Sequence, residues 1–191
     1  MNVLVLSGSP RPKSRTLLVS NLLAQLLNRA GANPTVWDLA ERPVPIADPE
    51  YHSDPTENPD PVVWDLVRQA NAADAFILAS PVYHNSFSGV LKNALDNLSI
   101  SQFHHKPVGL VAFGGSLTSV QVCDQLRTVV RGLLAIAVPA QIVAVGADFT
   151  VPEEGQLRIS NPDLVGRAQR MIDELERFSA ARARSEQASR A

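Results

Sequence analysis

Five apolar segments of strand length recur along this chain, and helical patterns separate each one from the next. Each segment is continuously apolar rather than alternating, which is typical of strands covered on both faces. Parallel strands meet that requirement, because right-handed crossovers place helices on each side of the sheet. The predicted strands comprise residues 3–6, 35–39, 75–79, 108–113 and 142–145.

The connections between these strands contain apolar residues at helical spacing. Gly31 follows the first such pattern as a left-handed cap would, and Pro61 and Pro162 stand where a helix can begin without a proline N–H. The predicted helices comprise residues 16–30, 61–72, 89–98, 119–134 and 162–180. This order predicts an α/β fold, a flavodoxin-like three-layer sandwich with a five-stranded parallel sheet of order 2-1-3-4-5 and helices on both faces.

The length of 191 residues, 45% of them hydrophobic, suits one domain with a sizeable core. We expect this single domain to span residues 1–180. Residues 181–191 form a tail without apolar anchors, so we expect disorder there, with fraying from Ser179. Residues 43–61 combine prolines with acidic side chains and lack any period, which predicts a loop that is either functional or an unimportant surface excursion.

The charge balance and the cysteine count exclude several classes of protein. The 17 basic and 19 acidic residues give a net charge of −2, which does not favour nucleic acid as a partner. A single cysteine precludes an intramolecular disulfide, and no apolar run approaches the length of a membrane span. The chain begins with a strand rather than a signal peptide, so we expect a cytoplasmic protein with a small-molecule partner. The adjacent His104 and His105 do not make a metal-ligand cluster, and no metal is expected.

The segment after the first strand predicts a phosphate-binding cradle. A turn that leads into a helix directs unpaired backbone N–H groups outward, and the helix dipole adds partial positive charge. Hydroxyl and guanidinium groups in this turn can donate hydrogen bonds to phosphate oxygens. They belong to Ser9, Arg11, Ser14, Arg15 and Thr16. The alternative is that Ser14 or Thr16 only caps the helix and that the basic residues are solvated.

Other phosphate-binding motifs fail on their spacing. Gly8 lacks the partner glycines of a dinucleotide fingerprint, and no Gly-Lys-Ser/Thr triplet is present for a nucleoside triphosphate loop. A cysteine phosphatase loop is also excluded, because Cys123 precedes Arg127 at a spacing that does not close a cradle. Cys123 is interpreted as a small core residue of a helix.

Two further loops are expected at the same edge of the sheet, because ligands bind beyond the carboxyl ends of parallel strands. They comprise residues 80–89, after the third strand, and residues 114–118, after the fourth. Tyr83 and His84 could flank a planar ring, whereas the alternative is that Pro81 ends a strand and Tyr83 packs against a neighbour. Gly114 and Gly115 permit a close backbone approach. A phosphate cradle beside such loops suits a mononucleotide with a planar head, such as flavin mononucleotide (FMN).

Four ordered blocks of sequence give the chain a family resemblance over residues 1 to about 145. The chain resembles the NAD(P)H-dependent FMN reductase family of flavodoxin-like proteins, and within it the reductases that serve alkanesulfonate monooxygenases. The blocks are Gly8-Ser9-Pro10-Arg11-Pro12-Lys13-Ser14-Arg15-Thr16, Ser80-Pro81-Val82-Tyr83, Ser88-Gly89-Val90-Leu91-Lys92-Asn93-Ala94-Leu95-Asp96 and Gly114-Gly115-Ser116.

The resemblance implies a binding site for FMN. It implies that the FMN phosphate is held by Ser9, Arg11, Ser14, Arg15, Thr16 and Leu17, and that the isoalloxazine is bordered by Pro81, Val82, Tyr83, His84, Asn85, Ser86, Gly114, Gly115 and Ser116. It further implies a homodimer or homotetramer, with the helix over residues 89–98 as a contact.

The implied reaction is hydride transfer from NADPH or NADH to FMN N5, and onward to free flavin, a quinone or another acceptor. Because the cofactors carry this chemistry, no catalytic side chain is assigned. The partner is a small-molecule electron acceptor or a flavin-dependent monooxygenase.

One departure from the sulfonate-linked relatives affects the role of the flavin. Residues 124–127 lack the extra aromatic or histidine residue associated with flavin as a passing substrate. FMN is therefore expected to be a prosthetic group, which leaves an azo, quinone or metal-oxyanion reductase as an alternative. A flavodoxin-type electron carrier is a second alternative. Such carriers are usually strongly acidic, however, and this chain has a net charge of −2.

Overall fold

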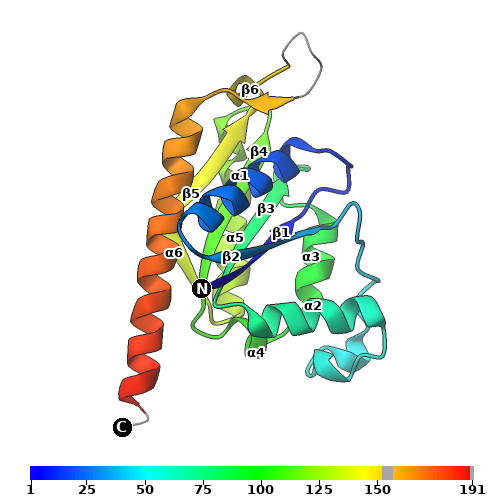
Figure 1. Ribbon diagram of the computed structural model, residues 1–191. Helices are drawn as coiled ribbons and strands as arrows, with labels where there is room; N and C mark the ends of the chain where they lie inside the picture. The colour runs from blue at the N-terminus through cyan, green and yellow to red at the C-terminus, as the bar shows by residue number, and fades with distance from the viewer. Residues whose placement is uncertain (152–156, 190–191) are drawn as a thin grey trace.

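A five-stranded parallel sheet forms the centre of the protein. The computed structural model describes residues 1–151 and 157–189. The strand order is β2-β1-β3-β4-β5, which confirms the predicted flavodoxin-like sheet (Figure 1). The strands are β1 (Asn2–Ser7), β2 (Asn33–Asp38), β3 (Ala75–Pro81), β4 (Pro107–Gly114) and β5 (Ile136–Val145).

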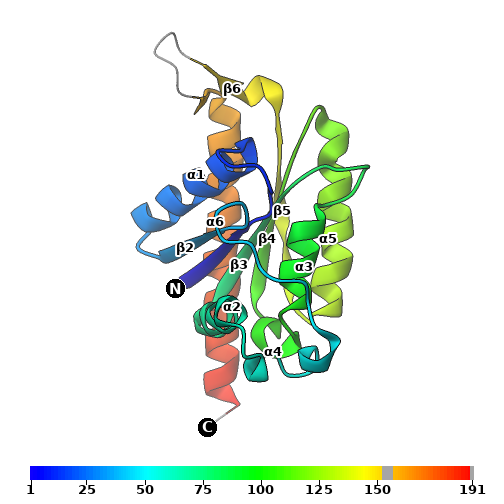
Figure 2. The ribbon, with the colours of Figure 1, turned by 90° about the vertical axis from the view of Figure 1, so that its right-hand side faces the viewer.

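Helices cover both faces of the sheet (Figure 2). One core lies between the sheet and α1 (Arg15–Arg29) and α6 (Pro162–Ala188). The other lies between the sheet and α2 (Pro61–Ala72), α3 (Gly89–Asp96), α4 (Ile100–Phe103) and α5 (Val120–Gly132). Successive β1 residues enter opposite cores, since Leu4 and Leu6 join one and Val3 and Val5 join the other. This division explains the continuous apolar runs in the sequence.

Strand β5 begins earlier than the sequence predicted, at Ile136 instead of residue 142. Pro139 interrupts the apolar run, so the continuous apolar pattern begins only after it. As the edge strand of the sheet, β5 tolerates a proline, and its pairing with β4 shifts register between Val108 and Leu110.

The predicted loop at residues 43–61 contains two short 3-10 helices, η1 (Pro49–Tyr51) and η2 (Pro55–Glu57). The Asn93 side chain of α3 anchors the start of this loop. Its amide nitrogen donates to the carbonyl oxygens of Val44 (3.0 Å) and Pro45 (2.8 Å), and its oxygen accepts from the N–H of Ala47 (2.9 Å). The loop is therefore tied to the body of the domain at its start.

The C-terminal region differs from the sequence expectation in two ways. A short antiparallel pair, β6 (Phe149–Thr150) with β7 (Arg158–Ile159), follows the sheet and was not predicted, because two-residue strands carry no detectable period. Helix α6 continues to Ala188, across most of the segment where we expected disorder. Alanine, arginine and glutamate extend a helix readily once its start is packed against the sheet.

The structure does not test two expectations about the C-terminal end of the chain. Residues 190–191 of the expected tail lie outside the described residues, and the domain boundary at residue 180 stays a prediction. Among the described residues, no helix has the length and apolar character needed to cross a membrane.

Lys106 is a buried charge at the start of β4, with only 7% of its surface exposed. Its Nζ donates to the carbonyl oxygens of Ala70 (3.0 Å) and Asn71 (3.3 Å). Burial, reinforced by the positive charge of Arg182, lowers the pKa of Lys106 from 10.5 to about 8. Folding therefore disfavours the protonated form of this lysine.

We expect the buried lysine to make stability depend on pH. Between pH 8 and 10.5 the unfolded chain keeps a proton on Lys106 that the folded chain loses, so the free energy of unfolding rises with pH across this window. Lys106→Met should abolish this rise, which is worth about 3 kcal/mol at most. Urea unfolding at several pH values measures this change in the free energy of unfolding, and Lys92→Met, at an exposed lysine, is the control. Parallel profiles for the parent and Lys106→Met would contradict the assignment.

Candidate functional site

A cleft of about 470 Å³ opens at the carboxyl edge of the sheet, where the loops after β1, β3 and β4 meet. The three loops that the sequence singled out are thus brought together. Ten of the predicted site residues line the cleft: Ser9, Arg11, Ser14, Arg15, Thr16, Pro81, Val82, Tyr83, Gly114 and Gly115. Five others do not line it: Leu17, His84, Asn85, Ser86 and Ser116.

Four residues of the cleft wall were not among the predicted site residues. They are Lys13, Phe113, Val151 and Leu157. Lys13 lies within the predicted cradle, and Phe113 is the last residue of a predicted strand, so the sequence pattern marks the position of both. Val151 and Leu157 follow β6 and precede β7, and no sequence pattern marked these two short strands.

The cradle residues surround the start of α1. Ser14 is the N-cap, and its Oγ accepts from the Leu17 N–H at 3.1 Å, so the capping interpretation of Ser14 is confirmed. The Ser14 hydroxyl hydrogen remains available as a donor. In the part of the chain that is described, the N–H groups of Arg15 and Thr16 have no backbone acceptor, because the first intrahelical bond runs from Leu18 to Ser14.

The cradle has unbalanced positive charge and an unpartnered buried hydroxyl. Over the described residues, none of Arg11, Lys13 and Arg15 forms a salt bridge. Thr16 is 1% exposed, yet its Oγ1 has no hydrogen-bond partner. A buried polar atom without a partner is unfavourable unless a ligand satisfies it. These features fit a phosphate group at the start of α1.

The Arg15 guanidinium lies beside two aromatic rings, of which Phe113 lines the cleft. Its Cζ is 5.7 Å from the ring centre of Phe113 and 5.9 Å from that of Phe149. The two rings meet edge to face, with centroids 5.8 Å apart. This contact restrains a long, flexible cationic side chain at the wall of the cleft.

The loop after β3 turns sharply at His84 and Asn85. The Tyr83 N–H donates to the Ser86 carbonyl (2.8 Å), and the Ser86 N–H donates back to the Tyr83 carbonyl (3.0 Å). The two residues between them have left-handed backbones, with φ of 48° at His84 and 62° at Asn85. This is the geometry of a type I′ turn. The turn presents Tyr83, which is 44% exposed, to the cleft.

Gly114 allows the loops after β3 and β4 to touch. A Cβ at this position would lie 1.8 Å from Ser119 Oγ and 2.5 Å from Val82 Cγ1. At Gly115 a Cβ would meet nothing within 4 Å, because that residue faces open space beside the cleft. The first glycine is therefore required by packing, and the second leaves room for a ligand.

The remaining chemistry-bearing residues do not add to this site. Burial raises the pKa of the Cys123 thiol to about 12, which agrees with its interpretation as a core residue of α5. The described residues include no group of three histidine, cysteine, aspartate or glutamate side chains placed to hold a metal ion.

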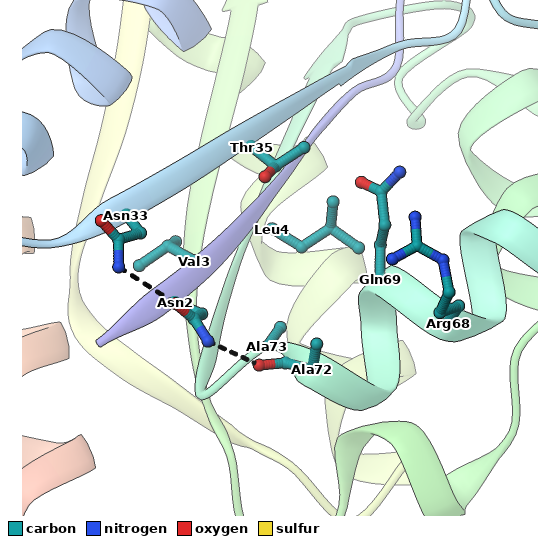
Figure 3. Close-up of a pocket in the computed structure, with 9 residues that line it drawn as sticks. All are labelled: Asn2, Val3, Leu4, Asn33, Thr35, Arg68, Gln69, Ala72 and Ala73. Atoms are coloured by element: carbon teal, nitrogen blue, oxygen red, sulfur yellow. Dashed lines mark hydrogen bonds between the residues drawn. The ribbon is translucent and has the colours of Figure 1, made fainter.

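A second cavity, of about 320 Å³, lies at the amino-terminal edge of β1 and β2 (Figure 3). Amide side chains line much of it, and Asn2 donates to the Ala72 carbonyl at 3.2 Å. Arg68 at its rim is paired with Asp65. The Asn33 side chain in turn donates to the Asn2 side chain. None of the three loops reaches this cavity, so it is not the candidate site.

Comparisons with known proteins show the family of the chain. A family model described as NADPH-dependent FMN reductase matches residues 1–150. The FMN-dependent NADPH-azoreductase of Staphylococcus saprophyticus is 36% identical over 178 residues, which cover 93% of this chain and 95% of that protein. The enzyme of the same name from Staphylococcus aureus is 36% identical over 181 residues, with the same coverage.

The solved structures extend the likeness of the fold. An oxidoreductase from Corynebacterium diphtheriae has a TM-score of 0.71 at 19% identity, covering 94% of this chain and 97% of that one. At this identity the likeness supports the flavodoxin-like architecture alone.

The two glycines after β4 offer a matched test of the packing at the cleft. Gly114→Ala should lower the free energy of unfolding by about 1–3 kcal/mol, because the new methyl group overlaps Ser119 and Val82. Gly115→Ala, where the space is open, should leave stability nearly unchanged. Urea unfolding of the two variants measures the difference. Equal stabilities would show that the loops do not require the close approach at Gly114.

Proposed function

Because this chain belongs to the NADPH-dependent FMN reductase family, we propose that it holds FMN as a prosthetic group and uses NADPH to reduce small planar acceptors. Azo compounds and quinones are the acceptor class we favour. The observation that carries the proposal is that the residues of the predicted phosphate cradle line the same cleft as Tyr83 and Gly115. The FMN-dependent NADPH-azoreductases, which are 36% identical over 93% of this chain, support the choice of acceptor.

The cradle at the start of α1 would hold the phosphate. Arg11 and Arg15 supply permanent positive charge, and the Thr16 hydroxyl would find in a phosphate oxygen the partner that it lacks. The N–H groups of Arg15 and Thr16 add dipoles directed at the same point. Ser9 and Ser14 line the same cleft, so we propose that they also contact the phosphate. Leu17 is left out of the proposed phosphate-binding residues, because its N–H donates to the Ser14 hydroxyl.

The loops after β3 and β4 would hold the planar head. Pro81, Val82 and Tyr83 form one wall, while Gly115 leaves backbone within reach of a flat ring. When bound, FMN would supply the redox chemistry, which is hydride transfer from the nicotinamide and electron transfer to the acceptor. The protein has to align two flat molecules and limit water between them. We assign no catalytic side chain to the reaction.

Several finer features of the function are also proposals. The azoreductase relatives favour a small-molecule acceptor over delivery of reduced flavin to a monooxygenase, and NADPH over NADH. We propose a homodimer or homotetramer in which α3 takes part in the contact, and a location in the cytoplasm.

Turnover with added acceptors tests the function directly. The purified protein should keep about one FMN per chain after desalting, and NADPH should bleach that flavin and support reduction of an azo dye or a quinone. Absorbance of the flavin and of NADPH follows both steps, with NADH run in parallel. A bound flavin that dithionite reduces but neither nicotinamide does would contradict the proposal and favour an electron carrier.

Arg15→Ala tests the phosphate cradle. Loss of a charge-assisted contact of about 1.5–3 kcal/mol should weaken FMN binding about ten- to more than a hundred-fold. Riboflavin, which lacks the phosphate, should bind the variant and the parent equally. Fluorescence titration of both flavins measures this, and Arg29→Ala, at the far end of the same helix, is the control. An unchanged FMN affinity in Arg15→Ala would remove Arg15 from the cradle.

A further inference from the structure

The turn at residues 83–86 lacks the residue pair that its geometry prefers. A type I′ turn requires left-handed backbones at both central residues, and asparagine followed by glycine is the preferred pair. Here the central residues are His84 and Asn85, so two residues with a Cβ adopt positive φ in succession. Their backbone strain has to be offset by contacts made elsewhere.

Gln125, in the middle of α5, supplies those contacts. Its Nε2 donates to the Asn85 carbonyl at 2.7 Å, and its Oε1 accepts from the Ser86 hydroxyl at 2.5 Å. Across residues 1–151 and 157–189, no other side chain forms a hydrogen bond with residues 83–86. One amide group therefore uses both its donor and its acceptor on the same turn.

The position of this turn determines where Tyr83 stands. Tyr83 lines the cleft, 44% of its surface is exposed, and its hydroxyl makes no hydrogen bond within the described chain. Its placement follows from the backbone of the turn, which is held by its own two hydrogen bonds and by Gln125. Gln125 itself does not line the cleft.

We propose that Gln125 is a positioning residue that holds the Tyr83–Ser86 turn in its left-handed form and so fixes the wall against which the flavin ring is placed. The inference rests on the proposed function. In this proposal, Gln125 of α5 supports the side of the cleft that meets the flavin ring. The side that meets the phosphate is supported by α1. Loss of the support should weaken ring contacts alone, so FMN and riboflavin should lose affinity by the same factor.

Gln125→Leu is the first test, because leucine has a similar size and forms no hydrogen bonds. We expect the dissociation constants of FMN and riboflavin to rise together, by about two- to twelve-fold for hydrogen bonds of ordinary strength. Gln121→Leu, an exposed glutamine one helical turn earlier, is the matched control and should bind both flavins as the parent does. Equal binding by Gln125→Leu and Gln121→Leu would overturn the inference.

A rescue experiment separates positioning from a general loss of stability. His84→Asn/Asn85→Gly installs the pair that type I′ turns prefer. In the Gln125→Leu background, this double substitution should restore most of the lost affinity for both flavins, because the turn then needs less support. A failure to restore it would overturn the inference, as would a drop in affinity confined to FMN. Thermal unfolding of each variant shows whether the domain as a whole has been weakened.

The outcome is distinguishable from a failure of the proposed function. A parent protein that binds neither flavin, or whose bound flavin is not reduced by nicotinamides, contradicts the function before any variant is compared. A parent that binds and reduces FMN, with Gln125→Leu indistinguishable from it, contradicts only the role of Gln125.

Discussion

The close contact between Gly8 and the end of β3 is the constraint on which the candidate site depends. The Gly8 N–H donates to the Ala79 carbonyl at 2.7 Å, and the buried Ser88 hydroxyl, at the start of α3, donates to the Gly8 carbonyl. A Cβ at Gly8 would lie 2.7 Å from that Ala79 oxygen and 2.8 Å from Leu91 Cβ. Only glycine allows the end of β1 to lie this close to the end of β3 and the start of α3. The cradle after β1 and the turn after β3 therefore face each other.

The same edge of the sheet concentrates positive charge in a chain whose net charge is −2. Arg11, Lys13 and Arg15 line one wall of the cleft, and no described acidic side chain pairs with them. Elsewhere some of the described charges are paired, as in the contact of Asp65 with Arg42 and Arg68. Unpaired cations beside a buried, unpartnered Thr16 hydroxyl favour an anion at this place and attract anionic ligands toward it.

The sequence predicted the sheet, its order and ten of the cleft residues, because these features have local signals. Apolar runs reveal buried parallel strands, and hydroxyl, glycine and basic residues mark the turns that follow them. Val151 and Leu157 had no such signal, since they flank two-residue strands whose pairing is set by tertiary packing. Gln125 could not be found either. Its role depends on a contact between residues 39 and 40 positions apart, and nothing in its own helix indicates that contact.

The two halves of the cleft are stabilised in different ways, which bears on what each half can recognise. The cradle is continuous with α1, and its Ser14 cap and helix packing form part of the core of the domain. Among the described residues, Gln125 is the side chain that forms hydrogen bonds with the turn at residues 83–86. In the assignment proposed above, the half of the cleft that is continuous with the core holds the phosphate, and the turn that Gln125 supports meets the ring. Such an arrangement would suit a reductase of planar acceptors of different shapes, because the cofactor phosphate, which is common to every turnover, would bind to the half that is packed into the core.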